Sequence, residues 1–428
     1  MLLNFHGDKI LIGYDLGNTY SQISYCPVAG GAMETISTVS GEESFNIPTV
    51  LCKRRQQNQW FYGREALRFA GEEDGILVDN LLALALDGEP IQLEGCAYDP
   101  AALLTLFLKR SLGLLSMVSS VDRIAALMIT CEEMNSRLIE VLGQAFGGLN
   151  LKNAPIYFQS YTESFYYYMI HQPAGLWAYQ TVLCDYDRER MKVYRMDCNK
   201  NTRPITVFIE EKEYPFPALD PLPEAENLRQ EKFGRMDREF LEIADDFCKD
   251  QRISSVFLIG EGYSEGWLKD SLRFLCRERR VFQGCNLYSK GACFGLRERY
   301  PDKNPEKSYV FLGKEKLKAN IGMKLYRRGE ESYYALLDAG VNWFEAKNSV
   351  EFYLQDENTI ELKLMPLGGK GVKLARITLD ELKNEVTRLR MCLTMTGENK
   401  MKVEISDLGF GEFFPSGGQV WSEEVKLY

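Results

Sequence analysis

The segment from Asp15 to Ser21 reads Asp-Leu-Gly-Asn-Thr-Tyr-Ser, which places one carboxylate beside a glycine and small hydroxyl side chains. Glycine backbone and hydroxyl groups can cradle phosphate oxygens, and the carboxylate of Asp15 can hold a hydrated Mg²⁺. A plain β-hairpin with a Gly-Asn turn would contain the same residues. The segment therefore predicts either a phosphate-binding loop or an ordinary hairpin.

Apolar runs on both sides of this segment predict the elements that position it. Lys9 to Tyr14 and Ser21 to Cys26 are two short strands, which makes the segment the tip of a hairpin with Asp15 at its mouth. Strand-then-helix patterns follow along the chain, with no internal repeat, at Arg123–Thr130 with Glu132–Phe146, at Thr181–Met196, and at Ser255–Gly260 with Trp267–Arg277. This alternation predicts an α/β fold.

The pattern changes near residue 300. Residues 301–307 are polar and contain two prolines, which predicts a linker between a first domain, 1–300, and a second domain, 308–428. In the second domain, apolar and polar residues alternate at period two, which predicts an antiparallel β-sandwich. Its expected strands are Ser349–Gln355, Thr359–Met365, Arg388–Met395 and Met401–Ser406.

Composition excludes several classes of function. The net charge of -10 opposes binding to DNA or RNA. The 11 cysteines are scattered without a Cys-x-x-Cys pair, so they predict reduced thiols rather than a disulfide framework or a zinc site. We also expect no membrane span, because no window approaches the roughly 18 apolar residues that a span requires. These features together predict a cytoplasmic protein without a membrane partner.

Five segments, in order, resemble the actin and DnaK-type heat-shock chaperone ATPase superfamily. They are Gly13–Ser24, similar to the first phosphate loop; Ile124–Leu149, similar to the strand and helix before the connection of the lobes; Val182–Asp185, similar to the second phosphate loop; Phe257–Phe274, similar to the adenosine loop; and Asn286–Leu296, similar to the closing helix. The resemblance implies a two-lobed, actin-like ATPase (ribonuclease-H-like) fold followed by a β-sandwich.

The resemblance also implies a site for ATP or ADP with Mg²⁺. It assigns the cofactor to Asp15, Gly17, Asn18, Thr19, Ser21, Gly260, Gly262 and Ser264, and the metal, through water, to Asp15 and Asp185. Asp185 and Glu163 would be catalytic, with Glu163 placing the attacking water on a cleft floor that it shares with both aspartates. Alternatively, Glu163 is only a helix N-cap partner of Ser160 or Thr162.

The sequence departs from the superfamily at the second loop. Asp185 is followed by Tyr-Asp-Arg-Glu-Arg instead of a glycine-rich turn, and Glu261 stands between two glycines of the adenosine loop. The segment between these loops is short, so the upper subdomains are reduced, and no counterpart of the active-site lysine is evident. These changes predict very weak or absent ATP hydrolysis, and they leave open a site that holds no cofactor.

The second domain resembles the peptide-binding β-sandwich of DnaK-type chaperones without a helical lid. Exposed aromatic residues would bind a protein or peptide partner, and the candidates are Phe410, Phe413, Phe414 and Trp421. A sandwich used only for packing is the alternative. The leading interpretation is a degenerate nucleotide-binding module that serves as a conformational or scaffolding, chaperone-like interaction protein. An active chaperone-like ATPase and an actin-like assembly protein remain the alternatives.

Overall fold

The computed structural model describes residues 9–39, 41–72, 74–149, 151, 154–300, 308–355, 357–367, 371–382, 386–412 and 414–427. The chain divides into two compact units, Met1–Phe311 and Leu312–Tyr428. The linker expected at 301–307 lies outside the described residues. The division falls slightly beyond Ser308, because strand β17 (Tyr309–Phe311) pairs in parallel with a strand of the first unit.

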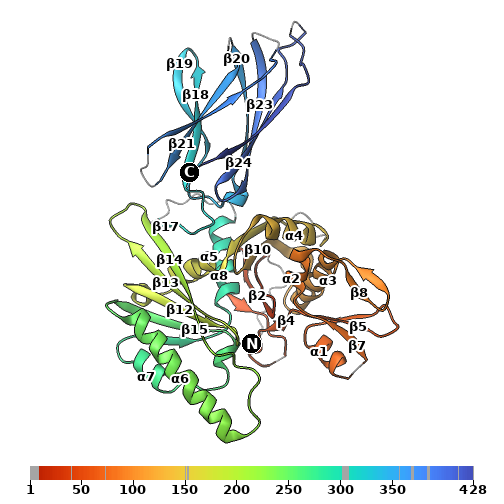
Figure 1. Cartoon of the computed structure of the whole chain (residues 1–428), viewed down its shortest axis with the longest axis vertical. Coiled ribbons are helices and arrows are strands. Elements are labelled where there is room, and N and C mark those ends of the chain that lie inside the picture. Colours follow the sequence, from red (N-terminus) through yellow and green to blue (C-terminus); the bar gives the residue numbers. More distant parts are fainter. Residues whose placement is uncertain are drawn as a thin grey trace. The chain divides into compact units, whose positions relative to one another are not determined.

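The first large sheet of the first unit has the strand order β11-β10-β1-β2-β3. Figure 1 labels β10 and β2 of this sheet. Its central strand β1 runs antiparallel to β2 and parallel to β10, which runs parallel to β11. Every residue of β1 and β10 is buried, as is usual for strands covered on both faces. The strands are β1 (Ile10–Leu16), β2 (Tyr20–Pro27), β3 (Glu34–Thr35), β10 (Ile124–Cys131) and β11 (Ile156–Ser160), and β4 (Ile47–Pro48) also pairs with β2.

The second large sheet has the order β16-β15-β12-β13-β14-β17. Here β12 runs antiparallel to β13 and parallel to β15, which runs parallel to β16. The strands are β12 (Gln180–Tyr186), β13 (Met191–Asn199), β14 (Ile205–Tyr214), β15 (Ile253–Ile259) and β16 (Arg280–Gln283). The helix expected within Thr181–Met196 is therefore wrong, because this stretch forms the β12–β13 hairpin.

The two sheets repeat one topology. In each, the first strand forms a hairpin with the second, the third extends that side, and the fourth and fifth add in parallel on the other side. The sequence shows no repeat, so the repetition lies in backbone topology. We call residues 9–170 the first half and residues 180–300 the second half of this unit.

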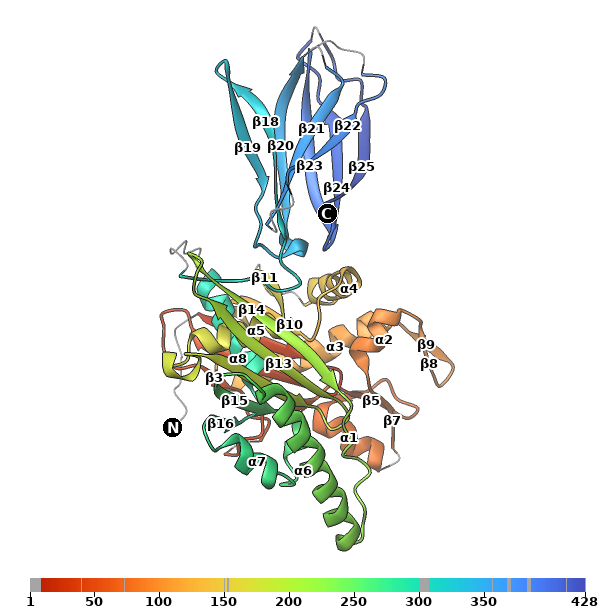
Figure 2. The ribbon, with the colours of Figure 1, turned by 60° about the vertical axis from the view of Figure 1, so that its left-hand side comes forward.

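Helices cover both faces of the second sheet. On one face, β12 residues Val182 and Cys184 pack against α6 (Glu226–Cys248) and α7 (Asp270–Leu275) (Figure 2). On the other face, Leu183 packs against α5 (Tyr161–Ile170) and α8 (Leu287–Arg299). Alternate residues of one strand thus face opposite layers, as the pleat of a β-strand requires.

Close backbone contacts join α8 to its neighbours. A Cβ atom on Gly291 would lie 2.0 Å from the carbonyl oxygen of Ser164 in α5. A Cβ atom on Gly13 in β1 would lie 2.2 Å from the carbonyl oxygen of Ser289 in α8. Only glycine fits at these two positions without a backbone shift, so the small residues bring α5, α8 and β1 together.

The helix after β10 begins later than expected. α4 spans Ser136–Gly147, and the side chain of Asn135 accepts a hydrogen bond of 2.9 Å from the backbone N–H of Leu138. Asn135 is therefore the N-cap, and this cap ends the loop that contains Glu132. The helix expected over Trp267–Arg277 is likewise shorter, since α7 covers only Asp270–Leu275.

Between β4 and β10, the described part of the chain forms small sheets and the α-helices α1, α2 and α3 (Figure 1). They are β5 (Leu51–Arg54), β6 (Trp60–Tyr62), β7 (Gly75–Val78), β8 (Ile91–Leu93), β9 (Cys96–Tyr98), α1 (Gly63–Gly71), α2 (Leu81–Asp87) and α3 (Pro100–Leu112). By length and composition alone, Pro100–Met117 could cross a membrane, contrary to the expectation from sequence. Leu104, Phe107 and Leu108 of this segment are buried.

The second unit consists of two four-stranded antiparallel sheets, as its alternating sequence predicts. Their orders are β19-β18-β21-β22 and β20-β23-β24-β25, and leucine, isoleucine and methionine side chains from both fill one core (Figure 2). The strands are β18 (Ala319–Arg327), β19 (Glu330–Leu337), β20 (Lys347–Gln355), β21 (Thr359–Pro366), β22 (Lys373–Thr378), β23 (Val386–Gly397), β24 (Lys400–Asp407) and β25 (Val420–Lys426).

Candidate functional site

A cleft of about 180 Å³ lies between the two halves of the first unit. The tips of both hairpins line it, together with the loops that follow the fourth strands, β10 and β15. The first hairpin contributes Asp15, Gly17, Asn18, Thr19, Tyr20 and Gln22, and the second contributes Asp185, Asp187, Arg190 and Lys192. In open α/β folds, ligands bind at the carboxyl ends of strands, which is where this cleft lies.

Asp15 and Asp185 occupy equivalent places in the two hairpins. Asp15 pairs with Gln22 across β1 and β2, and Asp185 pairs with Lys192 across β12 and β13. Each aspartate also lies beside the end of a fourth strand, next to Thr130 in β10 or Ile259 in β15. The repeated topology therefore brings two carboxylates into one cleft.

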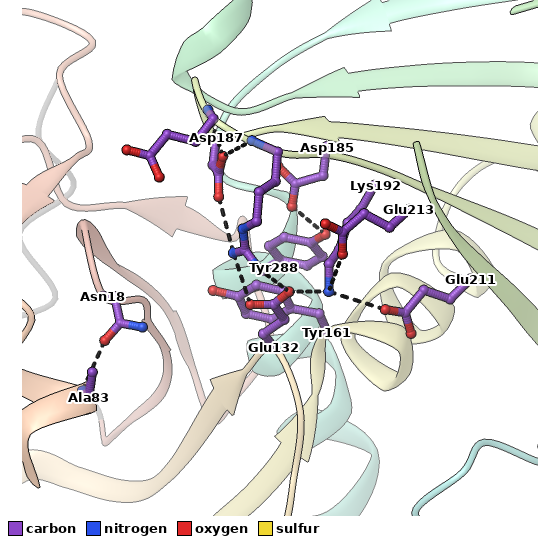
Figure 3. Close-up of polar contacts among 12 residues, drawn as sticks. Asn18, Ala83, Glu132, Tyr161, Asp185, Asp187, Lys192, Glu211, Glu213 and Tyr288 are labelled. Carbon is purple, nitrogen blue, oxygen red and sulfur yellow. Dashed lines mark hydrogen bonds and ion pairs between the residues drawn. The ribbon is translucent and has the colours of Figure 1, made fainter. Parts of the chain in front are cut away.

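A tyrosine at the start of a helix binds each aspartate. The hydroxyl of Tyr161 in α5 donates a hydrogen bond of 2.7 Å to Asp15, and that of Tyr288 in α8 donates one of 2.8 Å to Asp185. The two rings stack with centroids 3.8 Å apart and planes 10° apart (Figure 3). The stacked pair fixes both carboxylates relative to each other.

Burial raises the pKa of both carboxyl groups to about 7. For Asp15, the Tyr161 hydrogen bond lowers the pKa, whereas the charge of Asp185 raises it. For Asp185, the Tyr288 hydrogen bond lowers the pKa, and the charges of Asp187 and Glu132 raise it. Near neutral pH each group exchanges a proton readily, and a cation between them would favour both ionised forms.

The tip of the second hairpin binds its own backbone. Oδ1 of Asp187 accepts hydrogen bonds from the backbone N–H groups of Glu189, at 3.0 Å, and Arg190, at 2.8 Å. Arg188 adopts a φ of 89°, in the region that favours glycine, and its guanidinium forms two hydrogen bonds with Asp220. A carboxylate of the chain thus occupies donors that a glycine-rich loop would offer to phosphate.

Opposite charges connect the halves on one side of the cleft. Glu132, in the loop after β10, lies 3.3 Å from the guanidinium of Arg190 and also pairs with Lys192 (Figure 3). Lys192 in turn lies 3.3 Å from Glu211. Burial opposes the charged form of Lys192, but Glu132 and Glu211 more than compensate and raise its pKa.

On the other side of the cleft, the halves are connected by hydrogen bonds of a neutral side-chain amide instead of an ion pair. The side-chain amide of Asn46 donates to Glu261, in the loop after β15, and Gln22 donates to Asn46. Oε1 of Gln22 is buried and has no hydrogen-bond partner within the described part of the chain. Gln22 also lines the cleft, so this unsatisfied acceptor lies beside it.

Six of the residues expected at a nucleotide site line the cleft, namely Asp15, Gly17, Asn18, Thr19, Asp185 and Gly260. Oδ1 of Asn18 already accepts from the backbone N–H of Ala83, at 3.1 Å, and so ties the first hairpin to α2. The side chains of Ser21 and Ser264 do not line the cleft. Ser21 bonds Thr49 inside the fold, at 2.9 Å, and Ser264 donates to the carbonyl oxygen of Glu261 in its own turn, at 2.7 Å.

Gly262 also lies outside the cleft lining, and its role is close packing. A Cβ atom at Gly262 would lie 2.0 Å from the ring of Tyr186. Tyr186, which directly follows Asp185, therefore fills the space beside the loop after β15.

The structure does not bring Glu163 to the cleft. This carboxylate is 1% exposed and lies 3.2 Å from the guanidinium of Arg299. The backbone N–H of Glu163 donates to Oγ of Ser160, the N-cap of α5. The alternative expectation, a capping role near Ser160, fits this geometry, and the expected position on the cleft floor is wrong.

Sequence reasoning missed Glu132, Lys192 and the tyrosine pair. The helix expected over Glu132–Phe146 hides the place of Glu132 directly after a buried strand, where ligand sites commonly lie. Lys192 is hidden because its importance depends on register with Asp185. Tyr161 and Tyr288 begin helices in segments that the sequence singles out, but their stacking is a tertiary property.

Comparison with known proteins adds two matches. The family model described as the C-terminal part of a family of unknown function, DUF5716, matches residues 32–314. A domain of unknown function, DUF8552, matches residues 316–427. The two matches meet close to the division between the compact units. No curated protein matches the chain.

Proposed function

The chain belongs to the DUF5716 family of unknown function, and we propose that its first unit is a degenerate nucleotide-binding module of the actin and DnaK-type superfamily. In this proposal the cleft binds ATP or ADP with Mg²⁺ and hydrolyses ATP very slowly. Occupancy changes the relative stability of its conformations, and the chain acts as a conformational or scaffolding, chaperone-like interaction protein.

Topology supports a two-lobed, ribonuclease-H-like fold for this unit. Both large sheets have the order fifth-fourth-first-second-third, with an antiparallel hairpin beside a parallel pair. The helices after the fifth strands, α5 and α8, carry in their first turns the tyrosines that bind the two aspartates. A pair of such halves facing a shared cleft is the arrangement that the superfamily resemblance implies.

The observation that carries the proposal is the pairing of Asp15 and Asp185 across the cleft. The carboxylates of Asp15, which is buried, and of Asp185, which is partly buried, suit a hydrated cation. Within the described ranges, no group of three or more His, Cys, Asp or Glu side chains is arranged to hold a metal. The two aspartates fit a hydrated Mg²⁺ that arrives with a phosphate ligand, and such an ion would neutralise phosphate charge.

Two local features argue against efficient hydrolysis. Asp187 occupies backbone donors of the second hairpin, and Glu163 is paired with Arg299 away from the cleft. Loss of one oxyanion donor commonly reduces kcat about 10²- to 10³-fold, or about 3–4 kcal/mol. Binding requires fewer correctly placed groups than phosphoryl transfer does, so it can persist where turnover is lost.

We propose that a protein or peptide partner binds to a surface of the second unit. Phe410 and Phe414 are 46% and 40% exposed, and Phe410 contacts the exposed Tyr353 edge to face. Phe413 lies outside the described residues. Trp421 is only partly buried, and its indole N–H donates to the carbonyl oxygen of Asp380. Peptide-array binding by the full chain should weaken in Phe410→Ser. It should persist in the control Tyr326→Ser, because Tyr326 lies on β18, whereas Phe410 contacts Tyr353 on β20 of the other sheet.

Calorimetry with Mg·ADP and Mg·ATP, together with single-turnover hydrolysis, tests the nucleotide proposal. Asp15→Asn and Asp185→Asn should weaken Mg-dependent binding at least about tenfold, because each removes a charge that attracts the cation. The control Asp87→Asn changes an exposed residue at the end of α2 and should bind as the native chain does.

Three outcomes would contradict the proposal in different ways. Binding that neither aspartate variant alters would show that the cleft is not the site. If neither the native chain nor any cleft variant binds nucleotide, the proposed nucleotide binding is wrong. Turnover at ordinary ATPase rates, lost in both variants, would instead favour an active chaperone-like ATPase.

A further inference from the structure

Two positive side chains line the cleft within the described structure, and both come from the second hairpin. They are Arg190, whose side chain is 49% exposed, and Lys192, whose side chain is 13% exposed. Lys192 lies opposite Asp185 in the hairpin, and Arg190 lies at its tip. They are therefore the groups that could bind phosphate by side-chain charge, now that Asp187 occupies backbone donors of the same tip.

A carboxylate from the other half already holds both cations. The two oxygens of Glu132 lie 3.4 Å and 3.3 Å from the two terminal nitrogens of Arg190, and Oε1 also pairs with Lys192 (Figure 3). A guanidinium that faces two oxygens of one anion, with an ammonium beside it, is an arrangement that also binds phosphate. Glu132 thus has the position and charge of a bound anion.

We propose that Glu132 is an internal competitor for the phosphate groups of the ligand, and that Arg190 and Lys192 bind those phosphates once Glu132 is displaced. This inference rests on the proposed nucleotide function and deepens it. In the second hairpin, Arg190 and Lys192 would then take the role that backbone donors have in a glycine-rich loop. Glu132 occupies both side chains until a ligand enters.

The surrounding acids define the class of ligand. Asp187 lies 3.2 Å from Arg190, and Glu211 lies 3.3 Å from Lys192, so both cations keep a second acidic partner when Glu132 leaves. A single phosphate without a metal ion would bind weakly there, because Asp15 and Asp185 would repel it. A diphosphate or triphosphate that carries Mg²⁺ brings positive charge to the aspartates and negative charge to Arg190 and Lys192. The ligand class is therefore a Mg-polyphosphate, such as a nucleoside diphosphate.

The repeated topology shows why the competition is one-sided. Glu132 and Glu261 follow the ends of the fourth strands in the two halves, at equivalent places. Glu132 contacts a cationic hairpin across the cleft, whereas Glu261 contacts the neutral amide of Asn46. Only the Glu132 contact opposes an anionic ligand, and its release also breaks a connection between the halves. Ligand binding and the relative freedom of the halves are therefore linked.

The test compares the full-length native chain with Glu132→Gln by calorimetry using Mg·ADP. Removal of the competing charge should tighten binding about fivefold or more. The matched control Glu133→Gln changes the adjacent exposed glutamate and should bind as the native chain does. In the double variant Glu132→Gln/Arg190→Gln, the gain should shrink, because the phosphate then keeps only Lys192 of its two cations. Urea unfolding of each variant checks that the fold is kept.

Hydrogen exchange in the absence of ligand provides a second readout. Glu132→Gln should speed exchange in peptides that cover residues 186–192, and Glu133→Gln should not. If the native chain binds Mg·ADP and Glu132→Gln binds equally or more weakly, the competitor inference is wrong while the nucleotide function stands. If neither the native chain nor Glu132→Gln binds, both are wrong. Binding by Glu132→Gln alone would support both.

Discussion

The two hairpins of the first unit share a backbone and differ in chemistry. Both place an aspartate at the end of the first strand, and both turns connect strands in the same register. The first turn contains Gly17, Asn18 and Thr19, whereas Asp187, Arg188 and Glu189 stand at the same distance from the aspartate in the second. The first turn leaves room for a ligand. The second is filled by its own charged side chains.

This difference separates what the fold provides from what the residues provide. The fold gives each half an aspartate that accepts a hydrogen bond from a tyrosine. It also gives each half a glutamate in the loop after the fourth strand. The residues decide whether the neighbouring donors face a ligand or are occupied by the chain. A repeated topology can thus keep two facing carboxylates while the chain itself occupies the backbone donors of one hairpin.

The largest expected effect is on stability, and it follows from substitution of Glu163. This substitution tests whether the acid has a structural or a catalytic role. Glu163→Ala should lower the free energy of unfolding by about 3–5 kcal/mol, because it leaves the largely buried Arg299 without this carboxylate. Urea unfolding measures the change. The control Glu140→Ala removes an exposed pair with Arg137 and should change stability by less than about 0.5 kcal/mol.

Mg·ADP binding by Glu163→Ala, measured below its unfolding transition, should equal that of the native chain. A variant that stays as stable as the native chain but loses nucleotide turnover would return Glu163 to a catalytic role.

The next effect is the pH dependence of stability, to which both hairpins should contribute alike. Asp15 and Asp185 have pKa values of about 7 in the folded chain against an ordinary value of 3.8. Between about pH 4 and 7 the folded chain holds protons that the unfolded chain has released, so stability falls as pH rises through this window. Each Asp→Asn variant should remove about 2–4 kcal/mol of that fall.

Urea unfolding from pH 4 to 8 measures this slope, and Mg·ADP should reduce it because a cation favours the ionised carboxylates. If only one Asp→Asn variant flattens the curve, the two carboxyl groups do not share one environment, and the equivalence of the hairpins is broken.

The elements of the fold could be predicted from sequence more fully than the site. Buried apolar runs predicted β1, β10, β12 and β15 because these strands are covered on both faces, and period-two alternation predicted the antiparallel second unit. The expected helix in Thr181–Met196 failed because Lys192 and Arg195 are separated by two buried residues, a spacing that suits a helix as well as a strand covered on both faces.

For the site, the sequence identified the residues that carry a local signal. Asp15, Gly17 and Asp185 follow apolar strands directly, and the cleft contains all three. Glu163 lies in a recognisable segment, but its pairing with Arg299 depends on how α5 and α8 cross, which local sequence does not encode. The contact of Glu132 with Arg190 likewise joins residues far apart in the chain.

A smaller effect concerns the crossing of α5 and α8, where the two halves meet. Gly291→Ala should lower the free energy of unfolding by about 1–3 kcal/mol, since its Cβ would overlap the backbone of Ser164. The control Gly143→Ala, also in a helix, has open space around its Cβ and should raise stability by about 0.5–1 kcal/mol. Equal responses in urea unfolding would show that the halves do not meet at Gly291.

The smallest effect tests the two tyrosines, the most alike parts of the two halves. Tyr161→Phe and Tyr288→Phe keep the stacked rings but remove hydrogen bonds of 2.7 Å and 2.8 Å that favour ionised Asp15 and Asp185. Each substitution should raise the pKa of its own aspartate further and lower stability at pH 8 by about 1 kcal/mol, with little change at pH 4, where the carboxyl is protonated. Carbon-detected NMR titration of the carboxyl groups measures the shifts. Because each hydroxyl serves one aspartate, Tyr161→Phe should leave the Asp185 titration nearly unchanged, and Tyr288→Phe should leave that of Asp15. A shift of both carboxyls in either variant would mean that the pair titrates as one unit across the cleft, so that a ligand contacting only the open first hairpin would still change the charge of the second.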